Sequence, residues 1–355
     1  MTMARRLFLR IFGGRNGNLL AALLVALVIL AVFHPRYFSF DNVRVIALNQ
    51  AAVGIASVGM AYLIILGQVD LSIGSIYAAT AFMGAWLSLT EPAPLAILGG
   101  VLLGGAIGLA NGIAVWRIRV SPIIVTLGSL TLISGLLLVI TQGADITVTD
   151  GGFIEFGRAT PLGLPTFVWV MVIAAIIAHV VLSRTTIGRY IYAIGGNSEA
   201  ANVAGINVRR YVLALFVLTG CLVGLVGVMT AGRFASANNT YGATFNLDVI
   251  TAVILGGVAF TGGEGSITGV MVAVVFLGVV NSGLIALGVD PFYTDVVKGG
   301  ALLVSVLLEQ LTQERNERFR RSVAMAEYAA QFSERKEAAA APGGPRPGAP
   351  DVTEG

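Results

Sequence analysis

Long apolar stretches recur along this sequence, and short polar or glycine- and proline-rich joints separate them. A helix needs about 20 residues to cross a bilayer, and in lipid it satisfies its own backbone hydrogen bonds. Only 12% of the 355 residues are charged, against about 25% in an ordinary soluble domain. The sequence therefore predicts an all-α, polytopic integral membrane protein.

We expect about ten membrane-spanning helices. They cover residues 19–33, 43–66, 72–89, 95–116, 122–141, 166–183, 211–231, 247–260, 267–287 and 294–311. Residues 1–18 precede this transmembrane domain of residues 19–311, and 312–355 form a charged and then disordered tail, whose end has almost no apolar bulk. No small-x-small cleavage site follows the first apolar run, so we expect this span to be retained.

The arginines cluster in the joints between predicted spans. They occur at residues 5–15, 117–119, 184–210 and 315–321. An even number of predicted spans separates these clusters, so all of them fit the cytoplasmic side under the positive-inside rule. We therefore expect both termini and a loop at 184–211 to be cytoplasmic.

Motifs that carry enzyme chemistry are missing from the sequence. It contains no G-x-x-x-x-G-K-[ST], H-E-x-x-H, paired Cys-x-x-Cys or G-x-S-x-G pattern, so it lacks the usual sites for ATP phosphates, zinc and acyl transfer. Its one cysteine, Cys221, lies in an apolar run and has no partner for a disulfide. We expect no catalytic residue, metal or cofactor on this chain.

The stretch "GRYIYAIGGNSEAANVAGINVRR" at 188–210 is too polar for the bilayer. Asn197 or Ser198 is suited to cap a short helix, Glu199 suits the positive end of its dipole, and Gly205 suits a left-handed stop. Such a short helix is marginal alone in water. Its small side chains are expected to form a low surface for docking a partner outside the membrane: Ala200, Ala201, Val203 and Ala204. The alternative is a loop with an incidental helix.

Uncharged polar side chains in the second span and just after its end are candidates for a solute path. They are Asn49, Gln50, Tyr62 and Gln68. Neutral donors and acceptors with aromatic walls suit a hydroxyl-rich neutral solute. Amide side chains also bridge membrane helices, and that alternative stays open.

Asp70 and Asn246 each precede a predicted helix or open one. Because an unpaired carboxylate at the bilayer centre costs about 2.5 to 3.5 kcal/mol, we expect Asp70 to cap the next helix with Ser72. This role is favoured over direct contact with solute. The segments at 63–76 and 252–267 also resemble each other, since glycines interrupt a helix in both.

Five segments together resemble the ribose-type sugar ABC permeases. They are "TTIGRYIYAIGGNSEAANVAGINVRRYVLALFVLTG", "GQVDLSIGSIYA", "SPIIVTLGSLTLISGL", "FNLDVITAVILGGVAFTGGEGSITG" and "VDPFYTDVVKGGALLVSVLLEQ". The likeness covers roughly residues 40–311. It implies that residues 188–207 form the region that couples to ATP-binding subunits, with Gly188, Asn197, Ser198, Glu199, Ala200, Ala204 and Gly205 as candidate contacts.

The resemblance also implies partners that composition does not reveal. These are two ATPase chains that use ATP and Mg²⁺, a second permease copy, identical or related, and a periplasmic or extracellular sugar-binding protein. The expected function is import of a monosaccharide or related polyol across the bacterial cytoplasmic membrane by alternating access. The alternatives are an ion-coupled carrier of a small polar solute, and an importer of similar architecture for branched-chain amino acids or a sugar-like signalling molecule.

Overall fold

The computed structural model describes residues 17–118 and 120–290, together with residues 293, 296, 297, 299, 300 and 303. The chain divides into two compact units, Met1–Leu302 and Leu303–Gly355, and every feature below belongs to the first. Three predicted parts lie largely or wholly outside the described residues. They are the N-terminal segment at 1–18, the span at 294–311 and the tail at 312–355.

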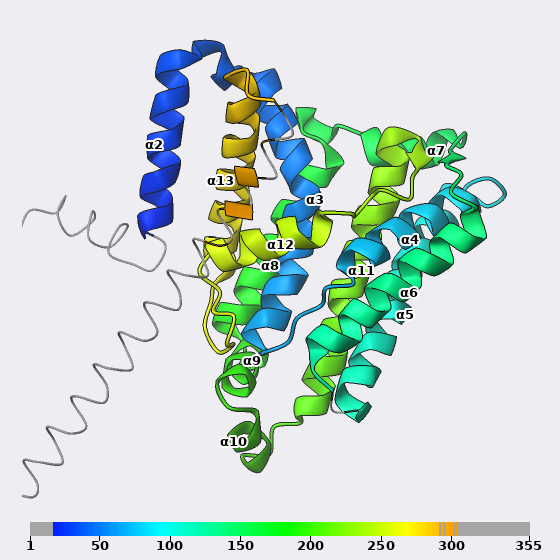
Figure 1. The fold of residues 1–355 in the computed structure, drawn as a ribbon, viewed down its shortest axis with the longest axis vertical. Coiled ribbons are helices and arrows are strands. Elements are labelled where there is room, and N and C mark those ends of the chain that lie inside the picture. The colour runs from blue at the N-terminus through cyan, green and yellow to red at the C-terminus, as the bar shows by residue number, and fades with distance from the viewer. Residues whose placement is uncertain are drawn as a thin grey trace, which may run out of the picture. The chain divides into compact units, whose positions relative to one another are not determined.

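Helices dominate the described chain (Figure 1). The first half contains α2 (Gly17–Phe33), the 3-10 helix η1 (Pro35–Phe38), α3 (Phe40–Ile65), α4 (Ile73–Leu87), α5 (Ala93–Ile118) and α6 (Pro122–Thr141). The second half contains α7 (Gly151–Arg158), the 3-10 helix η2 (Pro161–Gly163), α8 (Thr166–Arg184), α9 (Thr186–Gly196), α10 (Ser198–Val203), α11 (Val208–Phe234), α12 (Phe245–Leu255) and α13 (Ile267–Ala286). Two short strands, β1 (Ile146–Thr147) and β2 (Ser236–Ala237), pair antiparallel.

Six helices in the described part of the chain are long and apolar enough to cross a membrane: α3, α5, α6, α8, α11 and α13. Together with the shorter apolar helices α2, α4 and α12, they confirm the predicted all-α, polytopic class. The span predicted at 247–260 is shorter than expected. The 11 residues of α12 reach only about 16 Å at 1.5 Å per residue, roughly half of the hydrocarbon core.

Helix α11 contacts α5, α4 and α3 and forms the centre of the bundle (Figure 1). Glycines allow its close approach to α5: a Cβ on Gly104 would overlap the carbonyl oxygen of Gly220, and one on Gly108 would overlap that of Phe216. Small residues at this spacing let membrane helices pack backbone to backbone. The abundant glycines of these spans therefore have a packing role here.

The two ends of α11 define two ends of the molecule. A short turn, residues 204–207, joins α10 to the first residue of α11, Val208. Gly157 of α7 packs against Gly232 and Arg233 in the last turn of α11. These are called the α10 end and the α7 end below. In contrast to α11, helix α6 is little covered, and Thr126 is its one buried residue.

Two non-helical segments, 66–72 and 235–244, each lead into a short helix, α4 and α12 respectively. Figure 1 shows α12 crossing α3, with which it is in contact. α4 begins beside Asn111, whose side chain bonds to Ser72. Because Asn111 lies seven residues before the end of α5 at Ile118, the start of α4 lies about 10 Å inside the bundle.

Candidate functional site

Helix α10 is a six-residue helix with a cap at each end. Asn197 is the N-cap, and its Oδ1 accepts a hydrogen bond from the Ala200 N–H at 2.9 Å. Ser198, the other predicted cap, is instead the first helical residue. Glu199 lies in the first turn, where a negative charge complements the helix dipole.

The C-terminal end of α10 is closed by Gly205, which has a φ of +85°. Its N–H donates to the Asn202 carbonyl, and the Ile206 N–H donates to the Ala201 carbonyl, both at 3.0 Å. This is the Schellman arrangement, in which a left-handed glycine satisfies the last carbonyls of a helix. The short helix predicted from the sequence is therefore present with the expected stop residue.

The outer surface of α10 is small and largely exposed. Ala200 and Ala204 are exposed, as is Val203 at 89%. Ala201, which we expected on the same surface, is 5% exposed and packs inward. An exposed apolar residue on so short a helix is suited to contact a partner, and that role stays a prediction.

Helix α9 fills the rest of the predicted loop and was missed in the sequence. Its buried residues Gly188, Ile191 and Ile194 recur every three positions, which is the signal of an amphipathic helix. The Cβ of any larger residue at 188 would overlap the carbonyl oxygen of Leu182. Gly188 therefore permits the tight corner between α8 and α9.

Three parts of the chain that are distant in sequence meet at the end of α9. A Cβ on Gly195 would overlap the carbonyl oxygen of Ile65, and the Gly263 N–H donates to that same carbonyl at 2.8 Å. Gly262 packs against the Gly67 backbone. We call these five residues the glycine junction. It connects the segment that carries α10 to the end of α3 and to the turn before α13.

A side-chain hydrogen bond reinforces this junction. The Tyr192 hydroxyl of α9 donates to the Gly265 carbonyl at 2.7 Å. Burial raises the pKa of Tyr192 above its ordinary value of 10.0, so the hydroxyl remains a donor at physiological pH. This bond therefore ties α9 to the turn before α13.

The ends of α3 and α12 have the same geometry. Gly67 and Gly257 have φ values of +83° and +82°. Their N–H groups donate to the carbonyls of Ile64 and Ile254, each at 2.9 Å. The weak sequence similarity between 63–76 and 252–267 thus corresponds to a repeated helix stop.

Asp70 lies in the segment after α3 and is completely buried. Its Oδ1 accepts hydrogen bonds from the Ser72 N–H at 2.9 Å and the Ser72 hydroxyl at 2.5 Å. The Asn111 side chain donates to the same hydroxyl at 2.8 Å. These bonds fix the start of α4 to α5. Asp70 does not cap α4 as expected, because the N-cap is Ser72, whose side chain makes no capping bond. The contribution of Asn111 was not predicted.

Asn246 lies close to this cluster. Its Nδ2 donates to the Leu71 carbonyl at 3.4 Å, and its Oδ1 accepts from the Leu247 N–H at 3.0 Å. Nearby, the backbones of Gly74 and Gly242 are so close that a Cβ on either would overlap the carbonyl oxygen of the other. The beginnings of α4 and α12 therefore meet inside the bundle.

The other predicted path residues do not join this cluster. The Tyr62 hydroxyl donates to the Ala178 carbonyl at 2.7 Å and bridges α3 to α8. Asn49 lies about 20 Å further along α3, where its Oδ1 accepts from Arg233 at 2.9 Å, and Gln50 packs against Gly278. In this structure these three side chains connect helices. This agrees with the alternative role left open for the amides, which is to bridge membrane helices.

Aromatic residues near Asn246 were missed in the sequence. The rings of Tyr77 and Phe245 stack with centroids 4.6 Å apart, and those of Tyr77 and Tyr241 lie 6.2 Å apart. The run "TYGATFN", which leads into the first residues of α12, carries two of these aromatic residues. Aromatic surfaces beside amides are typical of sites for small hydroxylated molecules.

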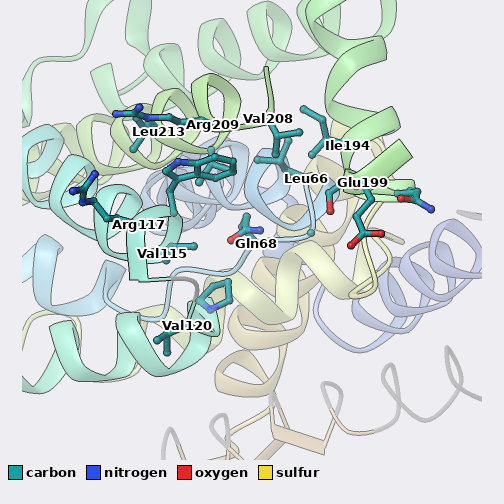
Figure 2. Close-up of a pocket in the computed structure, with 18 of the residues that line it drawn as sticks. Leu66, Gln68, Val115, Arg117, Val120, Ile194, Glu199, Val208, Arg209 and Leu213 are labelled. Carbon is teal, nitrogen blue, oxygen red and sulfur yellow. The ribbon is translucent and has the colours of Figure 1, made fainter. Parts of the chain in front are cut away.

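A cavity of about 820 Å³ lies at the α10 end (Figure 2). Its walls include Leu66 and Gln68 after α3, Trp116 near the end of α5, and residues 194–199 at the end of α9 and the start of α10. Gln68 is the one predicted path residue on this wall. The cavity therefore borders both the predicted coupling segment and the polypeptide that leads to Asp70.

Comparison of the sequence with known proteins places the chain in a family. The family described as "Branched-chain amino acid transport system / permease component" matches residues 43–306. The chain belongs to this permease family. Membership makes it a multi-pass membrane component of a transport system and not an enzyme.

Curated relatives match most of the chain. The ribose import permease protein of Escherichia coli K12 is 37% identical over 302 residues, which cover 83% of this chain and 93% of the relative. The L-arabinose ABC transporter permease protein of Azospirillum brasilense is 34% identical, covering 85% and 89% respectively. The D-allose transport system permease protein of Escherichia coli K12 is 34% identical, covering 80% and 89%. No solved structure matches the chain significantly.

Proposed function

We propose that this chain is the membrane-spanning permease subunit of an ATP-driven importer for a monosaccharide or related polyol. Relatives named for ribose, L-arabinose and D-allose transport support this solute class. The residues around the start of α4 and α12 fit a neutral solute, because uncharged amides and aromatic rings predominate there.

The single observation that carries the ATP-driven mechanism is the placement of α10. This capped helix exposes Val203 and connects through α9 and the glycine junction to segments inside the bundle. We propose that it docks on a separate ATPase, which binds ATP and Mg²⁺, while this chain binds no cofactor. Gly188 and Gly205 would shape the docking segment, while Asn197, Ser198, Glu199, Ala200 and Ala204 would form its contacts.

The distribution of arginines supports a cytoplasmic position for the α10 end. Arg117, Arg184, Arg189, Arg209 and Arg210 lie in or beside the joints at this end. We propose, under the positive-inside rule, that the α10 end and both termini face the cytoplasm. The membrane would be the bacterial inner membrane.

The proposed assembly contains two ATPase chains, a second permease copy and an external sugar-binding protein. The limited burial of α6 supports a second copy, because this helix leaves most of its surface uncovered by the described residues. Closure of the ATPases would displace α10, and the glycine junction would pass this displacement to the segments beside α3 and α13. The path would then open alternately to each side.

A second candidate is import of branched-chain amino acids, which the family description favours. An amino acid carries both a carboxylate and an ammonium group, and burying either charge requires a paired or hydrogen-bonded partner. Asp70 is fully buried, and its Oδ1 is bonded to Ser72, but its Oδ2 has no hydrogen-bond partner among the described residues. This carboxylate alone therefore does not exclude an amino acid. The relatives named for sugar transport favour the neutral solute, and a sugar-like signalling molecule remains a candidate of the same kind.

Uptake by the complex in proteoliposomes tests the proposal. The chain, its ATPase partner and the binding protein should accumulate radiolabelled D-ribose, L-arabinose or D-allose only when ATP is present on the ATPase side. Competition with unlabelled L-leucine separates the two solute classes. Uptake by the permease alone, driven by a proton or sodium gradient, would instead identify an ion-coupled carrier.

A further inference from the structure

The cavity at the α10 end separates charged groups of opposite sign. Figure 2 shows Gln68 between Glu199 on one side and Arg117 and Arg209 on the other. Both signs of charge lie on the exposed part of the wall, so the cavity has no single-sign field that would select an ion. Deeper in the cavity, the lining is provided by an uncharged amide and apolar side chains, among them Leu66.

The size and lining of the cavity suit a small hydroxylated molecule. Pockets for small molecules in general measure roughly 300 to 1,000 Å³ and combine apolar walls with a few polar groups. This cavity, at about 820 Å³, lies within that range, and Trp116 provides an aromatic surface on its wall. The lining therefore offers both a surface for the apolar face of a sugar and groups for its hydroxyls.

Gln68 supplies the polar group that lacks a partner. Its Oε1 is buried and has no hydrogen bond to any residue that the structure describes. Leaving a buried acceptor unpaired is unfavourable. The last torsion of a glutamine side chain turns easily, and such a turn would present this oxygen to a hydroxyl in the cavity.

The wall of this cavity also includes the start of α10. Asn197, Ser198 and Glu199 line it directly, and these residues form the cap and the first turn of that helix. On the other side, Gly67 and Gln68 belong to the segment that continues to Asp70. The cavity therefore borders both α10 and the inner end of the proposed path.

We propose that this cavity is an inner solute site, which holds a neutral monosaccharide against Gln68 before release at the α10 end. The inference rests on the proposed import function. It adds the position of a solute site and an effect of bound solute on the rate of uptake. Because the cavity borders α10, a high solute concentration on the α10 side keeps the site filled and slows further uptake. Transport is thus subject to inhibition by its own product.

Protection of a cysteine on the cavity wall tests this site in the assembled complex. Cys221→Ala removes the native thiol, and Thr261→Cys or Val120→Cys then places one on the wall. D-ribose at ten times its dissociation constant leaves roughly one site in ten empty, so modification by a maleimide should slow by roughly tenfold. Gln68→Ala should remove this protection at the same concentration.

The matched control is Ser183→Cys, an exposed position at the end of α8 that does not line the cavity. Its modification rate should not change with D-ribose. If wall cysteines are modified equally fast with and without sugar while ATP-driven uptake is intact, the inner site is refuted and the proposed function stands. If L-leucine protects and D-ribose does not, the assigned solute class is wrong. Absence of ATP-driven uptake would refute the proposed function itself.

Discussion

The α5–α11 interface and the glycine junction both bring backbones into contact, but they differ in what they join. At the interface, Gly104 and Gly220 lie within regular helices, and each packs against the carbonyl oxygen of the other. At the junction, Gly67, Gly262 and Gly263 have positive φ values and end helices or form turns. The first arrangement holds two complete helices together, while the second connects the ends of three segments. We therefore expect changes at the interface to act on stability and changes at the junction to act on transport.

The largest effect on stability is expected at the α5–α11 interface. Gly104→Ala places a methyl group against the Gly220 carbonyl, and overpacking of this kind typically costs about 1 to 3 kcal/mol. The purified chain should unfold at a clearly lower temperature. Gly135→Ala in α6 is the matched control, because a Cβ there meets no atom within 4 Å. Equal unfolding temperatures for the two variants would show that the close approach is unimportant for stability.

A smaller effect on stability, with a larger one on transport, is expected at the junction. Gly195→Ala pushes the end of α9 away from Ile65 and Gly263. Uptake of D-ribose per ATP hydrolysed should fall by roughly tenfold, which corresponds to about 1.4 kcal/mol. Gly196→Ala adds its methyl group to open space and should leave the unfolding temperature unchanged. An unaltered transport ratio in Gly195→Ala would mean that the junction does not carry the displacement.

The sequence was most informative where local chemistry decides the structure. The caps at Asn197 and Gly205 are short-range features, and both are present as expected. Asp70 likewise bonds to Ser72, two residues away. The class of fold followed from apolar length alone, because lipid leaves few other structures available to such a chain.

Contacts between distant segments could not be read from the sequence. The bond between Asn111 and Ser72 joins residues 39 positions apart, and Tyr62 bonds to Ala178 across 116 positions. An amide or hydroxyl in a membrane helix suits a neighbouring helix as well as a solute, so residue type alone did not separate these roles. The cavity arises in the same way, since its walls come from five or more separate parts of the chain.

The central claim is that α10 transmits work from a separate ATPase, and Glu199→Arg in the reconstituted complex tests it most directly. Glu199 is exposed in the first turn of α10, so the substitution should leave the membrane fold intact while it opposes the helix dipole and the proposed contact. Glu199→Gln is the control that removes the charge without reversing it. The measurement is D-ribose taken up per ATP hydrolysed. We predict that this ratio falls sharply in Glu199→Arg and much less in Glu199→Gln; a wild-type ratio in both variants would contradict the account.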